Sequence, residues 1–205
     1  MRNLVRIPTL FVTLGLIFGG TVGAQNQPSE EEIIRMAEEI HKGIVRLPNY
    51  GVFDNLSFAI QGNTVVLEGY ASRPTLKDSA ERVALRVKGV EEVLNNIEVL
   101  PNSSFDDELR ANVYVNIYGH PSLSRLNPNR GTPLFQSLIR REFGITNDPP
   151  PGNHPIHIIV KNGNVTLEGV VRTEGQRTIA GIQAGATAGV FSVTNDLVVP
   201  SELDQ

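Results

Sequence analysis

The sequence predicts an α+β protein made of two tandem α-β-β-α-β units, each with a three-stranded mixed sheet and two helices on one face. Three observations predict this fold. The stretch "GNTVVLEGY" at 62–70 returns as "GNVTLEGVV" at 163–171, so that Leu67 matches Leu167 at a shift of one hundred residues. The match extends on both sides without a gap, as expected for a duplicated unit. Within each copy, alternating apolar residues are followed by apolar residues at helical spacing.

The first 24 residues are predicted to be a secretory signal peptide. "MRNLVR" carries two arginines, the following stretch is apolar, and Val22 and Ala24 suit the minus-three and minus-one positions of a cleavage site. An uncleaved membrane anchor is the alternative, although the apolar stretch is shorter than the ~20 residues that span a bilayer. The chain has no cysteine, and therefore no lipoprotein lipidation site. We expect a periplasmic protein that begins near Gln25 and is not a lipoprotein.

The first copy follows the signal peptide. Ser29 and Glu32 form a capping-box pattern that starts a helix over 30–46. Alternating apolar residues around the turn at 61–63 predict a β-hairpin. Pro74 suits the first turn of a second helix, and the last strand is expected at 93–99. The predicted core positions of these elements are Ile33, Ala37, Ile40, Ile44, Leu56, Phe58, Ile60, Val65, Leu67, Leu76, Ala80, Val83, Ala84 and Val87.

The second copy begins with an ambiguous stretch, "DDELRANVYVNIYG". Its apolar residues fit helical spacing and also alternate as in a strand. Its position in the repeat, with Ser104 and Asp107 as a cap, favours a helix.

An insertion at about 122–153 has no counterpart in the first copy. Within it, Thr132 and Pro133 predict the start of a helix over about 131–143. Its apolar and basic residues suit a membrane interface or a partner groove, or the helix simply caps the core of the second copy. These candidate binding residues are Leu134, Phe135, Leu138, Ile139, Arg140 and Arg141.

The repeated stretches, "VVLEGYASRPTLKDSAERVALRVKGVEEVLNNIEV" and "VTLEGVVRTEGQRTIAGIQAGATAGVFSVTNDLVV", resemble the BON (bacterial OsmY and nodulation) domain. The family pattern is a V-x-L-x-G strand, an alanine-bearing helix, a G-V turn and a V-x-N strand. We therefore divide the chain into a signal peptide (1–24), BON domain 1 (25–101), BON domain 2 with its insertion (102–200) and a C-terminal tail (201–205). The resemblance implies a non-enzymatic envelope protein of diderm bacteria, linked to phospholipid binding, envelope integrity or osmotic stress, with no catalytic residues or cofactors to carry over.

Charge limits the partners. The chain has 18 basic and 22 acidic residues, and removing Arg2 and Arg6 with the signal peptide makes the mature protein more acidic still. This balance disfavours nucleic acid and a general attraction to anionic lipid. The expected partner is membrane phospholipid, bound locally, or alternatively a protein of an envelope complex. Ion or small-solute sensing is a weaker hypothesis. Docking between the two BON domains would also stabilise both, because units this small bury only about 60% of their unfolded surface.

The sequence offers little support for catalysis or a metal site. Glu68 and Glu168 occupy equivalent places in two separate copies and face away from the core residues of their strands, which indicates a structural or solubilising role. His154 precedes a strand and His157 points away from its apolar side, with no third ligand nearby. We therefore predict no catalytic residue and no metal ligand.

Asn95 and Asn195 fall on the core side of the last strand in each copy. An amide at such a position can satisfy backbone groups that the sheet leaves unpaired. We expect this structural role for both residues in preference to ligand binding.

Overall fold

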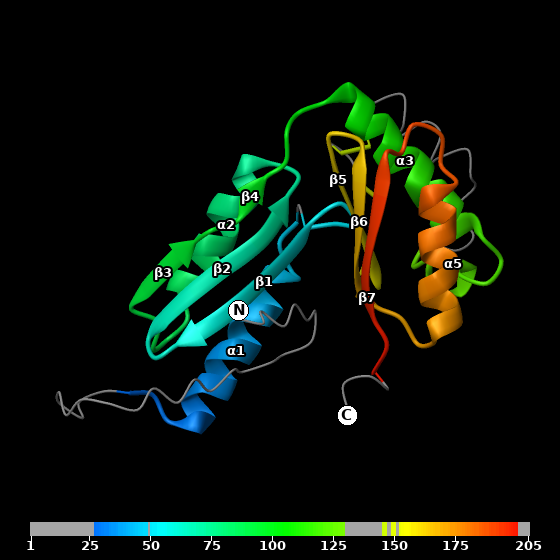
Figure 1. Cartoon of the computed structure of the whole chain (residues 1–205). Helices are drawn as coiled ribbons and strands as arrows, with labels where there is room; N and C mark the ends of the chain where they lie inside the picture. Colours follow the sequence, from blue (N-terminus) through cyan, green and yellow to red (C-terminus); the bar gives the residue numbers. More distant parts are fainter. Residues whose placement is uncertain (1–26, 49, 130–144, 147–148, 151, 201–205) are drawn as a thin grey trace.

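The computed structural model describes residues 27–48, 50–129, 145–146, 149–150 and 152–200. Within these ranges the chain forms two units in tandem, each with two α-helices on one face of a mixed sheet (Figure 1). Unit one runs from helix α1 to strand β4, and unit two from helix α3 to strand β7. The predicted fold class is confirmed.

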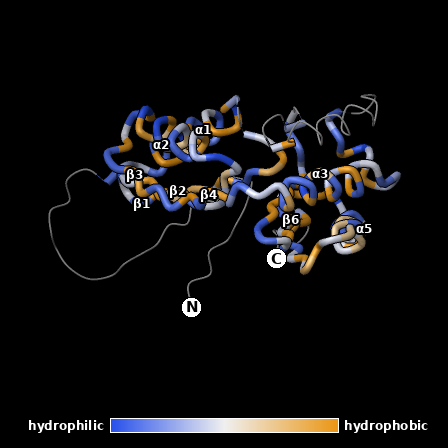
Figure 2. Tube along the Cα trace, turned by 90° about the horizontal axis from the view of Figure 1, so that it is seen from above, coloured by the Kyte–Doolittle hydropathy of each residue, from blue (hydrophilic) through white to orange (hydrophobic). Residues whose placement is uncertain are grey.

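Unit one has its two helices in a layer on one side of its sheet (Figure 2). Strand β1 pairs antiparallel with β2, and β2 pairs in parallel with both β3 and β4. The single strand expected at 93–99 is therefore present as two short strands that share the third position of the sheet. The elements are α1 (Glu30–Ile44), β1 (Asn55–Gln61), β2 (Thr64–Ala71), α2 (Pro74–Leu85), β3 (Glu92–Asn95) and β4 (Glu98–Val99).

Helix α1 begins as the sequence predicts. The Ser29 hydroxyl accepts a hydrogen bond from the Glu32 amide at 3.3 Å, and the Glu32 carboxylate accepts one from the Ser29 amide at 2.9 Å. The Glu32 carboxylate also accepts a hydrogen bond from the Ser29 hydroxyl at 3.2 Å, and the two bonds that it accepts from Ser29 lower the pKa of Glu32. The helix ends at Ile44, two residues before the expected end. Its apolar stripe packs with Leu67, Leu76 and the other core residues of unit one.

Unit two repeats the register of unit one. Leu56 pairs with Gly69 in the first hairpin, and Ile156 pairs with Gly169 in the second. The sequence could not separate helix from strand for the start of this unit, and the choice of a helix is confirmed. The elements are α3 (Ser104–Gly119), a 3₁₀ turn (Ser124–Leu126), β5 (Ile156–Lys161), β6 (Asn164–Val170), α5 (Glu174–Gly185) and β7 (Ser192–Val198).

The cap expected for α3 is wrong by one residue. Ser103, in an extended conformation, accepts a hydrogen bond from the Asp106 amide at 3.2 Å, whereas Ser104 is already the first helical residue. Asp107 instead pairs with the buried guanidinium of Arg110 at 2.5 Å.

Gly69 and Gly169 permit a close backbone approach. Their φ angles are +110° and +127°, and a Cβ atom at either position would lie 2.1 Å from a carbonyl oxygen of the preceding strand region. Only glycine combines this conformation with that contact.

Candidate functional site

Residues 50–55 of unit one, here called the seam segment, reach into unit two. Val52 and Phe53 are completely buried, and they belong to the hydrophobic core of unit two. The Val52 carbonyl accepts a hydrogen bond from the Ile158 amide at 2.7 Å, on the outer edge of β5. The ring of Phe53 lies edge-on to that of Tyr114, with 6.4 Å between centroids. One unit thus completes the core of the other.

Asp54 holds the seam segment in shape. Its carboxylate accepts hydrogen bonds from the Gly51 amide at 3.0 Å and from the Ser72 amide at 2.6 Å. The side chain is 1% exposed, and this burial raises its pKa although the hydrogen bonds act in the opposite direction. The segment is thereby fixed to the end of β2, next to unit two.

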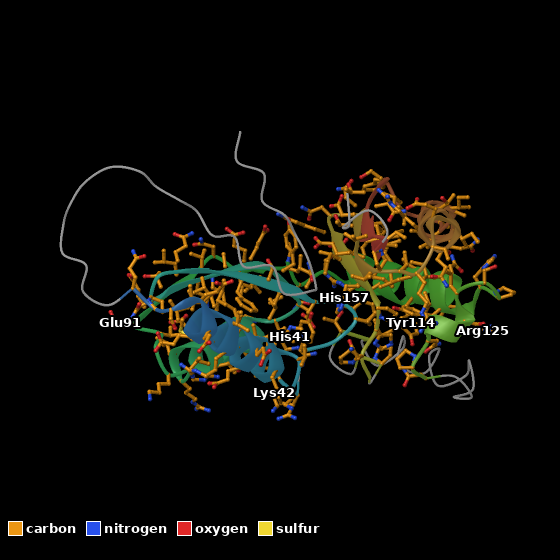
Figure 3. All side chains as sticks on the ribbon, turned by 90° about the horizontal axis from the view of Figure 1, so that it is seen from below. His41, Lys42, Glu91, Tyr114, Arg125 and His157 are labelled. Carbon is orange, nitrogen blue, oxygen red and sulfur yellow. The ribbon has the colours of Figure 1, made fainter. Side chains whose placement is uncertain are left out.

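Polar contacts extend the seam over the face of the β5–β6 hairpin that points away from the helices. The Asn55 amide donates to the Glu168 carboxylate. On the same face, the Tyr50 ring lies 5.6 Å from the ring of His157, which is paired with Glu168 across the hairpin, and Lys161 pairs with Glu98 at 2.5 Å. Figure 3 shows His157 where the two units meet.

The seam distinguishes the two strand glutamates that occupy equivalent places in the two copies. The sheet places Glu168 away from the helices, as the alternation predicts, but it is 4% exposed because Asn55 and its neighbours cover it. Its counterpart Glu68 stays partly exposed. Of the structural and solubilising roles expected for these two residues, the structural role is therefore confirmed for Glu168.

Both candidate histidines are buried. Desolvation lowers the pKa of His154 to about 4, and the rings of Tyr114 and Tyr118 lie 5.7 and 5.2 Å away. Burial also lowers the pKa of His157, whose Nδ1 has no hydrogen-bond partner within the described ranges. Within those ranges, no three His, Cys, Asp or Glu side chains are grouped as metal ligands would be.

The structural role expected for the two asparagines is confirmed. Asn95 donates to the Lys77 carbonyl at 3.1 Å, and Asn195 donates to the Arg177 carbonyl at 2.8 Å. Asn95 therefore ties β3 to α2, and Asn195 ties β7 to α5.

Unit two carries an exposed aromatic pair at one end, here called the end patch. It consists of Phe105 at the start of α3 and Phe191 just before β7, which are 45% and 73% exposed. Their rings lie 6.0 Å apart. The starts of both elements lie at the top of unit two in Figure 1. Exposed aromatic pairs of this kind are suited to binding.

The end patch is specific to the second copy. The one-hundred-residue shift aligns Phe191 with Glu91, which Figure 3 shows at the far end of unit one. Sequence reasoning missed the patch, although this replacement of a charged residue by an aromatic one was visible in the aligned copies.

The binding residues proposed from the sequence, at 134–141, lie outside the described residues, as do the predicted signal peptide and the C-terminal tail. Among the described residues, no helix has the length and apolar character needed to cross a membrane.

The family model described as "BON domain" matches residues 54–101 and 137–201, together more than half of the chain. The chain belongs to the BON domain family. Each match covers the hairpin, the following helix and the last strand of one unit, so both units are BON domains.

Solved structures with similarity to this BON protein include two of CdsD, a structural protein of the type III secretion system of Chlamydia trachomatis. The CdsD C-terminal domain is 15% identical, with 79% of this chain and 96% of that chain covered and a TM-score of 0.24. The second CdsD structure is 13% identical, with 82% and 95% covered and a TM-score of 0.24. A search of curated proteins finds no match.

Proposed function

We propose that this BON protein is a non-enzymatic binding module of the cell envelope, and that unit two associates with phospholipid surfaces through the end patch. The exposure of Phe191 and Phe105 is the observation that carries the proposal. Aromatic side chains are favourable at the boundary between headgroups and acyl chains, because part of each ring leaves water there. A role in envelope integrity or in the response to osmotic stress would follow from this attachment.

Membrane binding through the end patch would differ from binding through the 134–141 residues in its dependence on salt. Arg140 and Arg141 would be attracted to anionic headgroups, and salt weakens such an attraction. The two rings of the end patch carry no charge, so binding through them depends on apolar burial and changes little with salt. The chain has a net negative charge, which opposes its attraction to anionic membranes. This charge favours apolar binding through the end patch over charge-driven binding through Arg140 and Arg141.

Vesicle co-sedimentation of the chain from Gln25 onward tests the proposal. The vesicles contain phosphatidylcholine alone or with phosphatidylglycerol, at low and high salt. Changing Phe105 and Phe191 together to Ala is expected to weaken binding at both salt concentrations. Leu85→Ala is the control, since Leu85 is a 48% exposed apolar residue on α2 of unit one.

The outcomes separate the two surfaces. Loss of binding on Arg140→Ala with Arg141→Ala, but not on the paired phenylalanine change, would assign the membrane contact to the 134–141 residues. Absence of binding to any of these vesicles would rule out the lipid proposal.

Protein binding within an envelope complex is the second candidate, because exposed aromatic residues are also enriched at protein interfaces. On this alternative, the wild-type chain captures a specific envelope protein in a pull-down and does not sediment with vesicles. Changing Phe105 and Phe191 to Ala would then abolish the capture.

A further inference from the structure

The outer edges of the two hairpins differ. In unit two, the backbone groups along the outer edge of β5 are bound by groups from α3 and from the seam segment, which prevents another strand from pairing there. The contacts are Tyr118 Oη with the Ile156 amide (3.0 Å) and carbonyl (2.6 Å), the Val52 carbonyl with the Ile158 amide (2.7 Å), and Arg110 with the Val160 carbonyl (2.8 Å).

Strand β1 has the same register as β5, so the backbone groups of Leu56, Phe58 and Ile60 point to its outer edge. Tyr50 interacts with the Leu56 backbone, as Tyr118 does with Ile156. Within the described ranges, the outward groups of Phe58 and Ile60 have no hydrogen-bond partner. The strand, "NLSFAIQ", contains no charged residue and no proline, the residues that usually prevent pairing at an edge.

An exposed flank of α1 lies beside this edge. Ile34 and Val45 are 41% and 43% exposed, and helical spacing places them on one side of α1 with Glu38 and His41. Gly43, on the opposite side, faces Val83 of α2. The flank therefore points away from α2 and toward the β1 edge.

In unit two, the part of α3 that corresponds to the α1 flank is buried in contacts with the seam segment and the β5 edge. Met36 contacts Gly89 in unit one as Leu109 contacts Gly189 in unit two, which aligns α1 with α3. In that alignment, the positions of His41 and Val45 are held by Tyr114 and Tyr118. Tyr114 packs against Phe53 of the seam segment, and Tyr118 binds the β5 edge. Nothing in the described part of the chain covers the flank of α1 in this way.

We infer that the β1 edge and the α1 flank form an interface with a second copy of this chain. Paired with itself in the antiparallel direction, the flank is self-complementary. Ile34 would meet Val45 of the second copy, and Glu38 would meet His41 of the second copy. The pattern matches apolar with apolar groups and an acid with an imidazole, as a two-fold symmetric interface requires.

The strand edges fit the same symmetry. Two β1 strands that pair antiparallel about a two-fold axis join the sheets of both copies into one, with the helical layers on the same face. Phe58 and Ile60 would then gain partners for their outward backbone groups. The uncharged strand brings no like charges together.

Sedimentation equilibrium of the chain from Gln25 onward tests the inference. The average mass is expected to rise toward twice the monomer mass with concentration. Ile34→Lys with Val45→Lys places charges at both ends of the interface and is expected to raise the dissociation constant at least tenfold. Leu85→Lys with Leu94→Lys is the matched control, because these residues are also exposed in unit one but lie elsewhere. It is expected to leave the dimer unchanged.

A charge exchange tests the pairing of residues. Glu38→Lys alone is expected to weaken the dimer, and adding His41→Glu is expected to restore it by placing opposite charges across the interface again. Amide hydrogen exchange provides a second readout, since the Phe58 and Ile60 amides should exchange more slowly as the concentration rises. A monomer mass up to millimolar concentration would overturn the inference. A dimer that is insensitive to the flank variants, or that leaves both amides unprotected, would also overturn it.

Discussion

Phe53→Ala is expected to destabilise unit two, although Phe53 belongs to the chain of unit one. The side chain is 1% exposed and packs in the core of unit two against Tyr114. Truncating a buried phenylalanine to alanine costs about 3–5 kcal/mol, because transfer energy is lost and a cavity remains. Small domains have free energies of unfolding of about 5–15 kcal/mol, so the loss is a large part of the total.

Native-state amide exchange in increasing urea measures the effect in each unit separately. The slow amides of Leu167 and its neighbours in β6 are expected to lose most of this stability, and those of Leu67 in β2 to lose less. Phe58→Ala is the matched control, because Phe58 packs against the core of unit one. Phe58→Ala should destabilise the β2 amides more than the β6 amides. If Phe53→Ala left the β6 amides unchanged, the reasoning that the seam segment completes unit two would be refuted.

Three further outcomes are expected. Asp106→Ala removes the carboxylate that accepts hydrogen bonds from the amides of 162–163 at 2.9 and 2.8 Å, and it should cost about 2–4 kcal/mol in urea denaturation. Gly169→Ala, where a Cβ would lie 2.1 Å from a carbonyl oxygen, should prevent stable folding as judged by circular dichroism, whereas Gly62→Ala, with open space around it, should lower the stability by only about 1 kcal/mol. The pKa of His154 falls from 6.5 to about 4 on folding, so the free energy of unfolding should decrease by about 3 kcal/mol as the pH falls from 6.5 toward 4. Urea denaturation at a series of pH values measures this loss, with His154→Phe as the reference. A wild-type urea midpoint that fell no more over this range than that of His154→Phe would contradict the assignment.

The order of elements was predictable because it depends on local patterns that the chain contains twice. Leu67 and Leu167 mark equivalent strands, and the flanking helices follow from their apolar spacing. The ambiguous start of unit two was resolved by its place in the repeat, which no local pattern could have done. Its cap was misplaced by one residue because Ser103 and Ser104 are chemically identical.

The seam was not predictable by the same reasoning. Val52 and Phe53 follow a helix and precede a strand, where apolar residues normally pack against their own unit. Their contacts with unit two involve residues more than fifty positions away, and hydrophobic periodicity carries no information about such distances. The burial of Glu168 has the same cause, because strand alternation assigns a side chain to a face of the sheet but not to what covers that face. The docking of the two units in solution is a separate prediction, and the Phe53→Ala experiment tests it.

The seam segment also affects the order in which the protein can mature. A chain that emerges amino end first completes the helices and strands of unit one while the residues that surround Phe53 have yet to arrive. During that interval an aromatic ring and a valine side chain are left in water, and such groups attract chaperones or other nascent chains. A truncation that ends between the copies would make this interval permanent, so the isolated first half is expected to aggregate more readily than the complete protein.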